Sequence, residues 1–261
     1  LRGAAPETES KAALTFDGFP FHSPAEADQA AVVTDILRIL DQRGIQAIWF
    51  KTTSGLNGFR LSLLDEWVRR GHLIGNHTAN HPRYSNTAWE VYQYDIDLAD
   101  RTLRRWDRGR IFFRPPELNC GYSLAANQRL TDFLAARGLR LVLATITLTD
   151  FEGAAAYVDA VKSGDRRFQE ELRDWYQTEF KGATLRAETS SRYLCKRRIN
   201  HIVLVHASRL TADNLAAVLD WMQSRGYRWV SIDEALTDPV YDFTGPDYDP
   251  CARPLLRLSP Q

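Results

Sequence analysis

Short apolar runs alternate along this chain with longer segments in which apolar residues recur every three or four positions. Residues 12–16 and 45–50 are apolar runs of strand length, and residues 25–43 and 61–70 follow them with a helical period. A glycine comes directly after each of the two helical segments, as is common where a helix ends. The first part of the chain therefore predicts strand, helix, strand and helix in succession.

The same alternation continues toward the end of the chain. The further elements we expect are a helix capped by Asn86 or Thr87 and reaching Leu103, strands over 111–113, 139–147 and 201–208, helices over 124–137 and 215–225, and a last strand and short helix within 227–236. Strands that are joined through helices pair in parallel. The pattern therefore predicts an α/β fold with a mostly parallel inner sheet.

The rhythm changes near Phe151. Residues 157–180 have a helical pattern rich in charge, and residues 182–199 are polar and expected to be irregular. The tail from Asp238 contains five prolines, which favours a segment that wraps over the core. We expect a single domain over 1–261, with its core at about 12–236, a helical insertion at about 151–200 and a C-terminal tail at 237–261.

Composition narrows the function classes. The 261 residues include 44% hydrophobic residues, enough for a sizeable core. Lys plus Arg and Asp plus Glu both number 33, so no basic field favours nucleic acid as a partner. No apolar run approaches the roughly 18 residues of a membrane span. The three cysteines allow one disulfide and one free thiol, with Cys195 and Cys251 the favoured pair, or three free thiols.

Polar residues with catalytic chemistry lie just beyond the ends of several apolar runs. They are Asp17 after "ALTF", Arg114 after "IFF", Asp150 after "ATITLT" and His206 within "IVLVH". In parallel α/β folds the carboxyl ends of the strands meet at one edge, where catalytic groups converge. Strand ends are polar in most proteins, so the joint placement of these residues counts for more than any one of them.

His77 and His81 stand four residues apart in "IGNHTANHP". This spacing places two imidazoles on one face of a helical turn, where both can reach one metal ion. Pro82 follows directly, so a single turn is the most that the segment can form. Two histidines at this spacing are also common on ordinary protein surfaces, and the pair alone leaves a metal site open.

The order of these segments resembles the five motifs of the NodB-like polysaccharide deacetylases, carbohydrate esterase family 4. The motifs are "LTFDGFP", "GNHTANHP", "FFRPPELNCG", "LTDF" and "IVLVH", and the similarity extends from about Ala12 to Leu236. The resemblance implies a distorted (β/α) barrel of about seven strands with a groove for a sugar polymer. It also implies removal of acetyl groups from N-acetylglucosamine residues or, less often, from xylan.

The resemblance assigns a role to each residue that matches a motif. It implies a divalent metal, usually zinc, that polarises the acetyl carbonyl and activates a water. His77 and His81 match the two histidine ligands. Asp17 matches the base that deprotonates the water, and Arg114 matches the arginine that keeps this base ionised.

The later motifs supply the acid and the substrate pocket. His206 matches the acid that protonates the leaving amine, and Asp150 matches the carboxylate that orients it. Leu204 matches a wall of the acetyl-methyl pocket, and the backbone N–H of Glu117 matches the oxyanion contact. The family also implies a polysaccharide partner and a secreted or periplasmic location.

The first motif departs from the family pattern at one position. The family has two adjacent aspartates there, the second being the third metal ligand, whereas this chain has Asp17 followed by Gly18. The loss removes one negative charge from the metal shell. The residues that could rebuild the shell are Asp17, Glu117, His22, Asn119 and Cys120.

We therefore expect a metal-assisted N-deacetylase acting on peptidoglycan or another N-acetylglucosamine polymer. A carbohydrate-binding relative that has lost catalysis is one alternative, and a small-amide hydrolase that needs little or no metal is another. Trp89, Tyr92 and Tyr122 are candidates for stacking on sugar rings.

Overall fold

A parallel sheet of eight strands forms the centre of the computed structural model, which describes residues 10–19, 25–107, 109 and 111–242. The strands are β1 (Ser10–Asp17), β2 (Ala47–Lys51), β3 (Leu73–Asn76), β4 (Ile111–Phe113), β5 (Leu139–Leu141), β6 (Ile146–Thr147), β7 (His201–His206) and β8 (Tyr227–Trp229). Seven of them lie in the order β5-β4-β3-β2-β1-β7-β6, and β8 pairs with β1 outside this path. The predicted α/β class and parallel sheet are confirmed.

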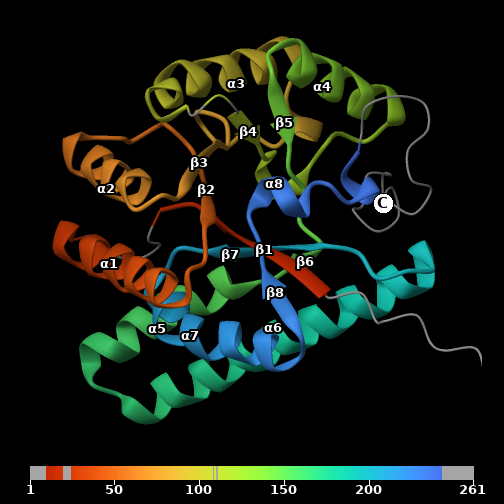
Figure 1. Ribbon diagram of the computed structural model, residues 1–261. Helices are drawn as coiled ribbons and strands as arrows, with labels where there is room; N and C mark the ends of the chain where they lie inside the picture. The colour runs from red at the N-terminus through yellow and green to blue at the C-terminus, as the bar shows by residue number, and fades with distance from the viewer. Residues whose placement is uncertain (1–9, 20–24, 108, 110, 243–261) are drawn as a thin grey trace, which may run out of the picture.

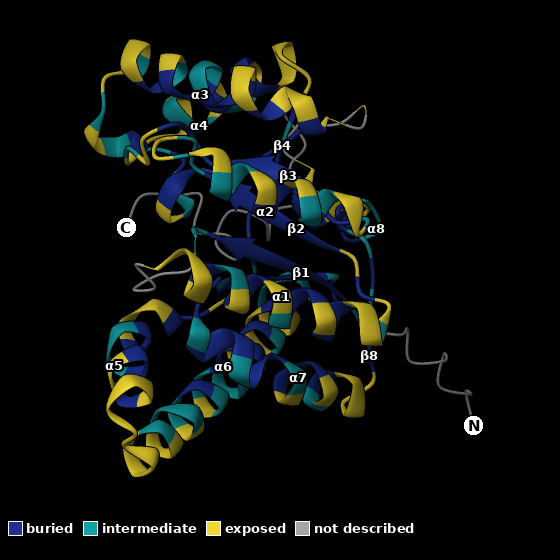
Figure 2. Cartoon of the chain, turned by 90° about the vertical axis from the view of Figure 1, so that its left-hand side faces the viewer, coloured by how far each residue is buried: buried dark blue, intermediate teal, exposed yellow. Residues whose placement is uncertain are grey.

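Helices connect the strands and cover the sheet (Figure 1). They are α1 (Glu26–Arg43), α2 (Gly58–Arg69), α3 (Trp89–Leu103), α4 (Leu124–Ala136), α5 (Asp150–Ser163), α6 (Arg166–Cys195), α7 (Arg209–Ser224) and α8 (Ile232–Ala235). Short 3-10 turns lie at η1 (Tyr84–Asn86), η2 (Arg104–Trp106), η3 (Pro116–Leu118) and η4 (Pro239–Tyr241). Figure 2 shows the buried strands between α3 and α4 on one side and α5, α6 and α7 on the other.

Both faces of the central strands are buried, and alternate residues serve separate parts of the core. In β1, Leu14 and Phe16 belong to one apolar cluster and Ala13 to the other. In β7, Val203 and Val205 join the first cluster while Ile202 and Leu204 join the second. This alternation follows from the two-residue period of a strand, and it explains why the strands read as continuous apolar runs.

The sheet curls because its two end strands are close neighbours along the chain. The segment 139–147 was predicted as one strand, but it forms β5, which pairs with β4, and β6, which pairs with β7. The residues between them turn the corner: the Val142 N–H donates to Phe113 and the Thr145 N–H to Ile202. The implied distorted barrel of about seven strands is confirmed. The prediction of one strand over 139–147 was wrong, because this segment forms two strands.

The helical insertion differs from its prediction in two ways. The helical segment predicted over 157–180 is divided at Gly164, whose φ of 73° ends α5. The segment 182–199 was predicted to be irregular, but α6 continues through it to Cys195. Small residues on one helical face, Ala183 and Ala187, pack into the core and hold this stretch in the helix. The other faces of this stretch are mostly charged or polar, so the few small buried residues did not produce a clear helical pattern in the sequence.

Two helix starts also needed correction. Neither Asn86 nor Thr87 caps α3, whose N-cap position is Ala88, because the Thr87 hydroxyl donates instead to the Arg83 carbonyl. Helix α7 begins at Arg209, ahead of the predicted start at 215, and the Ser208 hydroxyl caps it by accepting from the Thr211 N–H. The start of α7 buries Thr211 and Asn214 together with Leu210 and Ala212, so polar residues interrupt the apolar pattern there.

The predicted tail is described only as far as Asp242, and its remaining residues lie outside the described part. Cys120 is a free, buried thiol, Cys195 is disulfide-bonded, and Cys251 lies outside the described residues. Within the described ranges, every helix is too short or too polar to span a bilayer.

Candidate active site

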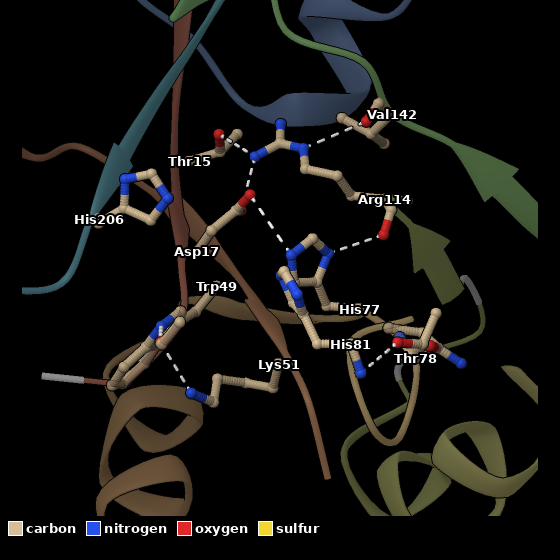
Figure 3. Close-up of polar contacts among 12 residues, drawn as sticks. Thr15, Asp17, Trp49, Lys51, His77, Thr78, His81, Arg114, Val142 and His206 are labelled. Atoms are coloured by element: carbon tan, nitrogen blue, oxygen red, sulfur yellow. Dashed lines mark hydrogen bonds and ion pairs between the residues drawn. The ribbon is translucent and has the colours of Figure 1, made fainter. Parts of the chain in front are cut away.

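The carboxyl ends of four strands bring the predicted residues to one edge of the sheet. Asp17 ends β1 and His206 ends β7, and these two residues are direct partners in the register of the parallel pair. His77 directly follows the end of β3 at Asn76, and Arg114 directly follows the end of β4 at Phe113. Residues that lie far apart in the sequence therefore share one edge, as expected for parallel strands (Figure 3).

Asp17 and Arg114 form a buried ion pair. Arg114 Nη1 donates to Asp17 Oδ1 at 2.8 Å and to the Thr15 hydroxyl at 2.7 Å, and Arg114 Nε donates to the Val142 carbonyl at 3.2 Å. Burial raises the pKa of Asp17, but the charges of Arg114 and His77 outweigh it and hold the pKa below the ordinary value of 3.8. Asp17 is therefore a carboxylate at neutral pH.

His206 and Asp150 form the second charge pair. Asp150 begins α5 and is buried, and its Oδ1 lies 2.7 Å from His206 Nδ1. Its Oδ2 accepts from the His206 N–H at 2.7 Å and from the Thr211 hydroxyl at 3.2 Å. Burial lowers the pKa of His206, but the bond to Asp150 and its charge outweigh burial and raise the pKa above its ordinary 6.5. The pair can hold a proton on His206 and release it from Nε2.

The loop that carries His77 and His81 is held in a strained shape. Thr78 has a φ of 63° and His81 a φ of 60°, in the left-handed region that side chains other than glycine rarely adopt. Asp95 of α3 fixes this loop, because Oδ2 accepts from the N–H groups of Ala79 at 2.9 Å and Asn80 at 2.8 Å. Strain that is kept in place by such bonds is typical of functional sites.

His77 presents an unprotonated nitrogen to Asp17. Its Nδ1 lies 2.7 Å from the Arg114 carbonyl, which only accepts, so Nδ1 carries the hydrogen. Burial lowers the pKa of His77 to about 4, so the ring is neutral at pH 7. Nε2 therefore faces Asp17 Oδ2 at 3.7 Å as a second acceptor. A water that donates to both atoms, or a cation, can bridge them.

The donor set fits the family's metal site only in part. His77 and His81 lie together, with ring centroids 5.0 Å apart, but Gly18 offers no carboxylate as a third ligand. Asp17 is already bound by Arg114. Among the described residues, no group of three or more His, Cys, Asp or Glu side chains is arranged to hold a metal.

The other residues that could have rebuilt the shell are engaged elsewhere. Burial raises the pKa of the Cys120 thiol to about 12, which opposes the thiolate that zinc requires. The Asn119 side chain accepts from the Ser85 N–H at 2.8 Å. The exposed Glu117 carboxylate pairs with Arg83 at 3.4 Å. His22 lies outside the described residues. A three-ligand zinc site of the family type is therefore not formed by the described residues.

Two further residues of this edge were missed by the sequence analysis. Thr15 is fully buried and links the strands, because its hydroxyl donates to the Val203 carbonyl at 2.7 Å and accepts from Arg114. Lys51 ends β2 and is also fully buried. Lys51 stands directly after the apolar run "AIWF" in the sequence. Asp17 was selected because it is a polar residue at the end of an apolar run, and the same criterion selects Lys51.

The Lys51 side chain contacts Gly18, which stands where the resemblance expects a metal-binding aspartate. Its Nζ donates to the Gly18 carbonyl at 2.7 Å and lies 3.3 Å from the centre of the Phe19 ring. Burial lowers the pKa of Lys51 well below 10.5, Arg60 adds to this and Asp17 opposes it. The carbonyl and the ring face both stabilise the ammonium form and oppose this effect of burial.

The residues predicted to contact substrate are placed as follows. Leu204 is buried in β7 beside Thr15 of β1, and Glu117 lies in η3 with a φ of 55°. Tyr92 was a wrong candidate for sugar stacking, because it is fully buried and stacks on Tyr84 with ring centroids 4.6 Å apart. Trp89 is half-buried against other rings, whereas Tyr122 is exposed. Tyr122 alone of the three keeps an open ring face.

A family model for polysaccharide deacetylases matches residues 4–141, over half of the chain. The chain therefore belongs to the polysaccharide deacetylase family. A curated relative, the peptidoglycan-N-acetylglucosamine deacetylase of Bacillus cereus, is 28% identical over 240 residues, which cover 88% of this chain and 90% of the relative.

Solved structures share the fold. The chitin deacetylase of Colletotrichum lindemuthianum matches with a TM-score of 0.61 at 20% identity, over 88% of each chain. A pseudoenzyme of carbohydrate esterase family 4 from Bacillus anthracis matches with a TM-score of 0.59 at 14% identity, over 88% of this chain and 66% of that one. A mutant of this pseudoenzyme with restored enzymatic activity matches with a TM-score of 0.59 at 16% identity, over 88% and 68% of the two chains. Family and fold thus agree with the resemblance seen in the motifs.

Proposed function

We propose that this protein hydrolyses N-acetyl groups on a polysaccharide, with peptidoglycan or another N-acetylglucosamine polymer as its substrate. The observation that carries the proposal is the pairing of Asp17 with Arg114 and of His206 with Asp150 at one edge of the sheet. One pair keeps a base ionised, and the other keeps an acid protonated. Hydrolysis of an amide needs both groups in these states.

The base acts first in the proposed reaction. A water bound between Asp17 Oδ2 and His77 Nε2 gives a proton to Asp17 as its oxygen attacks the acetyl carbonyl. The Glu117 N–H would donate to the developing oxyanion, and Leu204 would contact the acetyl methyl group. Arg114 keeps Asp17 ionised until the transfer, so that the carboxylate is ready to accept a proton.

The acid completes the reaction. His206 Nε2 gives its proton to the amide nitrogen as the carbon–nitrogen bond breaks, which leaves acetate and a free amine on the sugar. Asp150 stabilises the imidazolium before the transfer and fixes the direction of the ring. His77 and His81 remain the predicted metal ligands, but two imidazoles fall short of the family's ligand set. No step of this scheme is therefore assigned to a metal.

A secreted or periplasmic location is part of the proposal. Polymers such as peptidoglycan lie outside the cytoplasm, and the disulfide at Cys195 suits an oxidising compartment. Tyr122, which follows the third motif in the sequence, has an exposed ring on which a sugar of the polymer would stack.

The second candidate is a sugar-binding relative that does not hydrolyse its ligand. It is favoured by the loss of the carboxylate at Gly18 and by a structural neighbour that is described as a pseudoenzyme. The two candidates separate when binding and hydrolysis of a chitin oligomer are measured on the same sample. Acetate release that requires His206 supports the enzyme, whereas binding with no acetate from chitin oligomers or peptidoglycan supports the binding protein.

A further inference from the structure

Residue 18 is anchored to a positively charged side chain by its backbone. The Gly18 carbonyl accepts from Lys51 Nζ at 2.7 Å and from Trp49 Nε1 at 2.5 Å. The φ of Gly18 is 73°, so the chain turns sharply directly after Asp17. In the family pattern an aspartate at this position would bind the metal ion and so fix the same turn. Here the hydrogen bond from Lys51 Nζ to the Gly18 carbonyl fixes the turn.

Lys51 also connects this turn to the histidine loop. Its own carbonyl accepts from the His77 N–H at 3.0 Å, while its Nζ holds Gly18. One residue thus contacts both the turn after the base and the first predicted metal ligand. The Nζ lies 3.3 Å from the Phe19 ring centre and 4.7 Å from that of Trp49, so two aromatic faces stabilise its charge.

Charge at this turn opposes a further cation. Glycine in place of the family's aspartate removes one negative charge, and the Lys51 ammonium places one positive charge on the same turn. Adding a divalent ion beside a buried ammonium, with one carboxylate fewer to bind it, is electrostatically unfavourable.

We propose that Lys51 is a built-in cation that fixes the turn after Asp17 without a metal ion and weakens binding of a divalent metal at His77 and His81. The inference concerns metal binding, and it stands apart from whether the chain hydrolyses a polysaccharide. In this scheme the turn after Asp17 stays fixed without a metal, because Lys51 and Trp49 hold it.

The test is a zinc titration by calorimetry on the full chain, freed of metal and carrying no histidine tag. Wild type should bind zinc in the micromolar range or more weakly. Lys51→Met removes the charge and keeps the length of the side chain, and it should tighten zinc binding about ten- to a hundredfold. Lys51→Arg keeps the charge and should leave the affinity weak. Lys162→Met, at an exposed position of α5, is the matched control and should change nothing.

Each outcome decides the proposal. Nanomolar zinc binding by wild type would overturn it, as would a Lys51→Met variant that folds but binds zinc no more tightly. If Lys51→Met does not fold, the wild-type titration decides together with Gly18→Asp. With Lys51 present, the new carboxylate should pair with the ammonium and leave zinc binding short of nanomolar. Nanomolar binding by Gly18→Asp alone would show that Lys51 does not oppose the metal.

Discussion

Arg114 donates to the carboxylate of Asp17 at 2.8 Å, and both side chains are buried. A buried ion pair contributes to stability mainly through what happens when one partner is lost. Here the same pair also sets the charge of the proposed base, so folding and the proposed catalysis depend on one contact.

Asp17→Asn should lower the free energy of unfolding by about 3 kcal/mol at neutral pH, because Arg114 keeps its charge and loses its partner. Denaturant titration measures this loss. Asp97→Asn is the control, because the Asp97–Arg137 pair is about one-third exposed and its loss should cost less than about 1 kcal/mol.

The stability difference between wild type and Asp17→Asn should depend on pH. The folded-state pKa of Asp17 is depressed, so its contribution is full above the ordinary pKa of 3.8 and is lost as pH falls through the lower folded value. A difference that stays constant down to strongly acidic pH would contradict the ion pair.

Asp150→Asn should move the basic limb of the pH–rate profile to lower pH. The Asp150 carboxylate raises the pKa of His206 above 6.5, so the wild type keeps its acid protonated beyond that pH. The variant loses this support, and the pKa of His206 should fall. The profile of kcat/KM for acetate release measures the shift, and an unmoved basic limb would argue against His206 as the acid.

Asp95→Ala should release the loop of His77 and His81. Two N–H groups of this loop lose the carboxylate that holds the left-handed φ angles of Thr78 and His81. We expect a loss of about 2 kcal/mol in the free energy of unfolding and a fall in kcat/KM of about tenfold or more. Asp97→Ala on the same helix is the control. An unchanged kcat/KM in a destabilised variant would show that loop shape does not matter for the reaction.

The sheet and the strand ends were predictable from the sequence because both depend on local signals. Apolar runs located the strands, and the rule that parallel strands end at one edge grouped Asp17, Arg114 and His206 correctly. Asp150 was predicted as the partner of His206, and the structure places it there, at 2.7 Å. The resemblance to the family supplied the roles, which the spacing alone could not.

Features that depend on tertiary contacts escaped the sequence analysis. Thr15 looked like one more strand residue, and its bonds to Val203 and Arg114 follow from the register of β1 with β7. The helical state of 182–195 depends on a narrow stripe of small residues that packs on the core. The contact between Lys51 and Gly18 could not be predicted from the sequence, because it depends on β2 ending beside the turn at Gly18.

Acetate release from an N-acetylglucosamine oligomer, measured with and without Asp17, tests the central claim most directly. Wild type should release acetate and leave a free amine, which mass spectrometry detects as the loss of one acetyl group per hydrolysed sugar. Asp17→Asn should lower kcat/KM by about a hundredfold or more if it remains folded. Acetate release that is unchanged in Asp17→Asn, or no release by wild type from either chitin oligomers or peptidoglycan, would contradict the account.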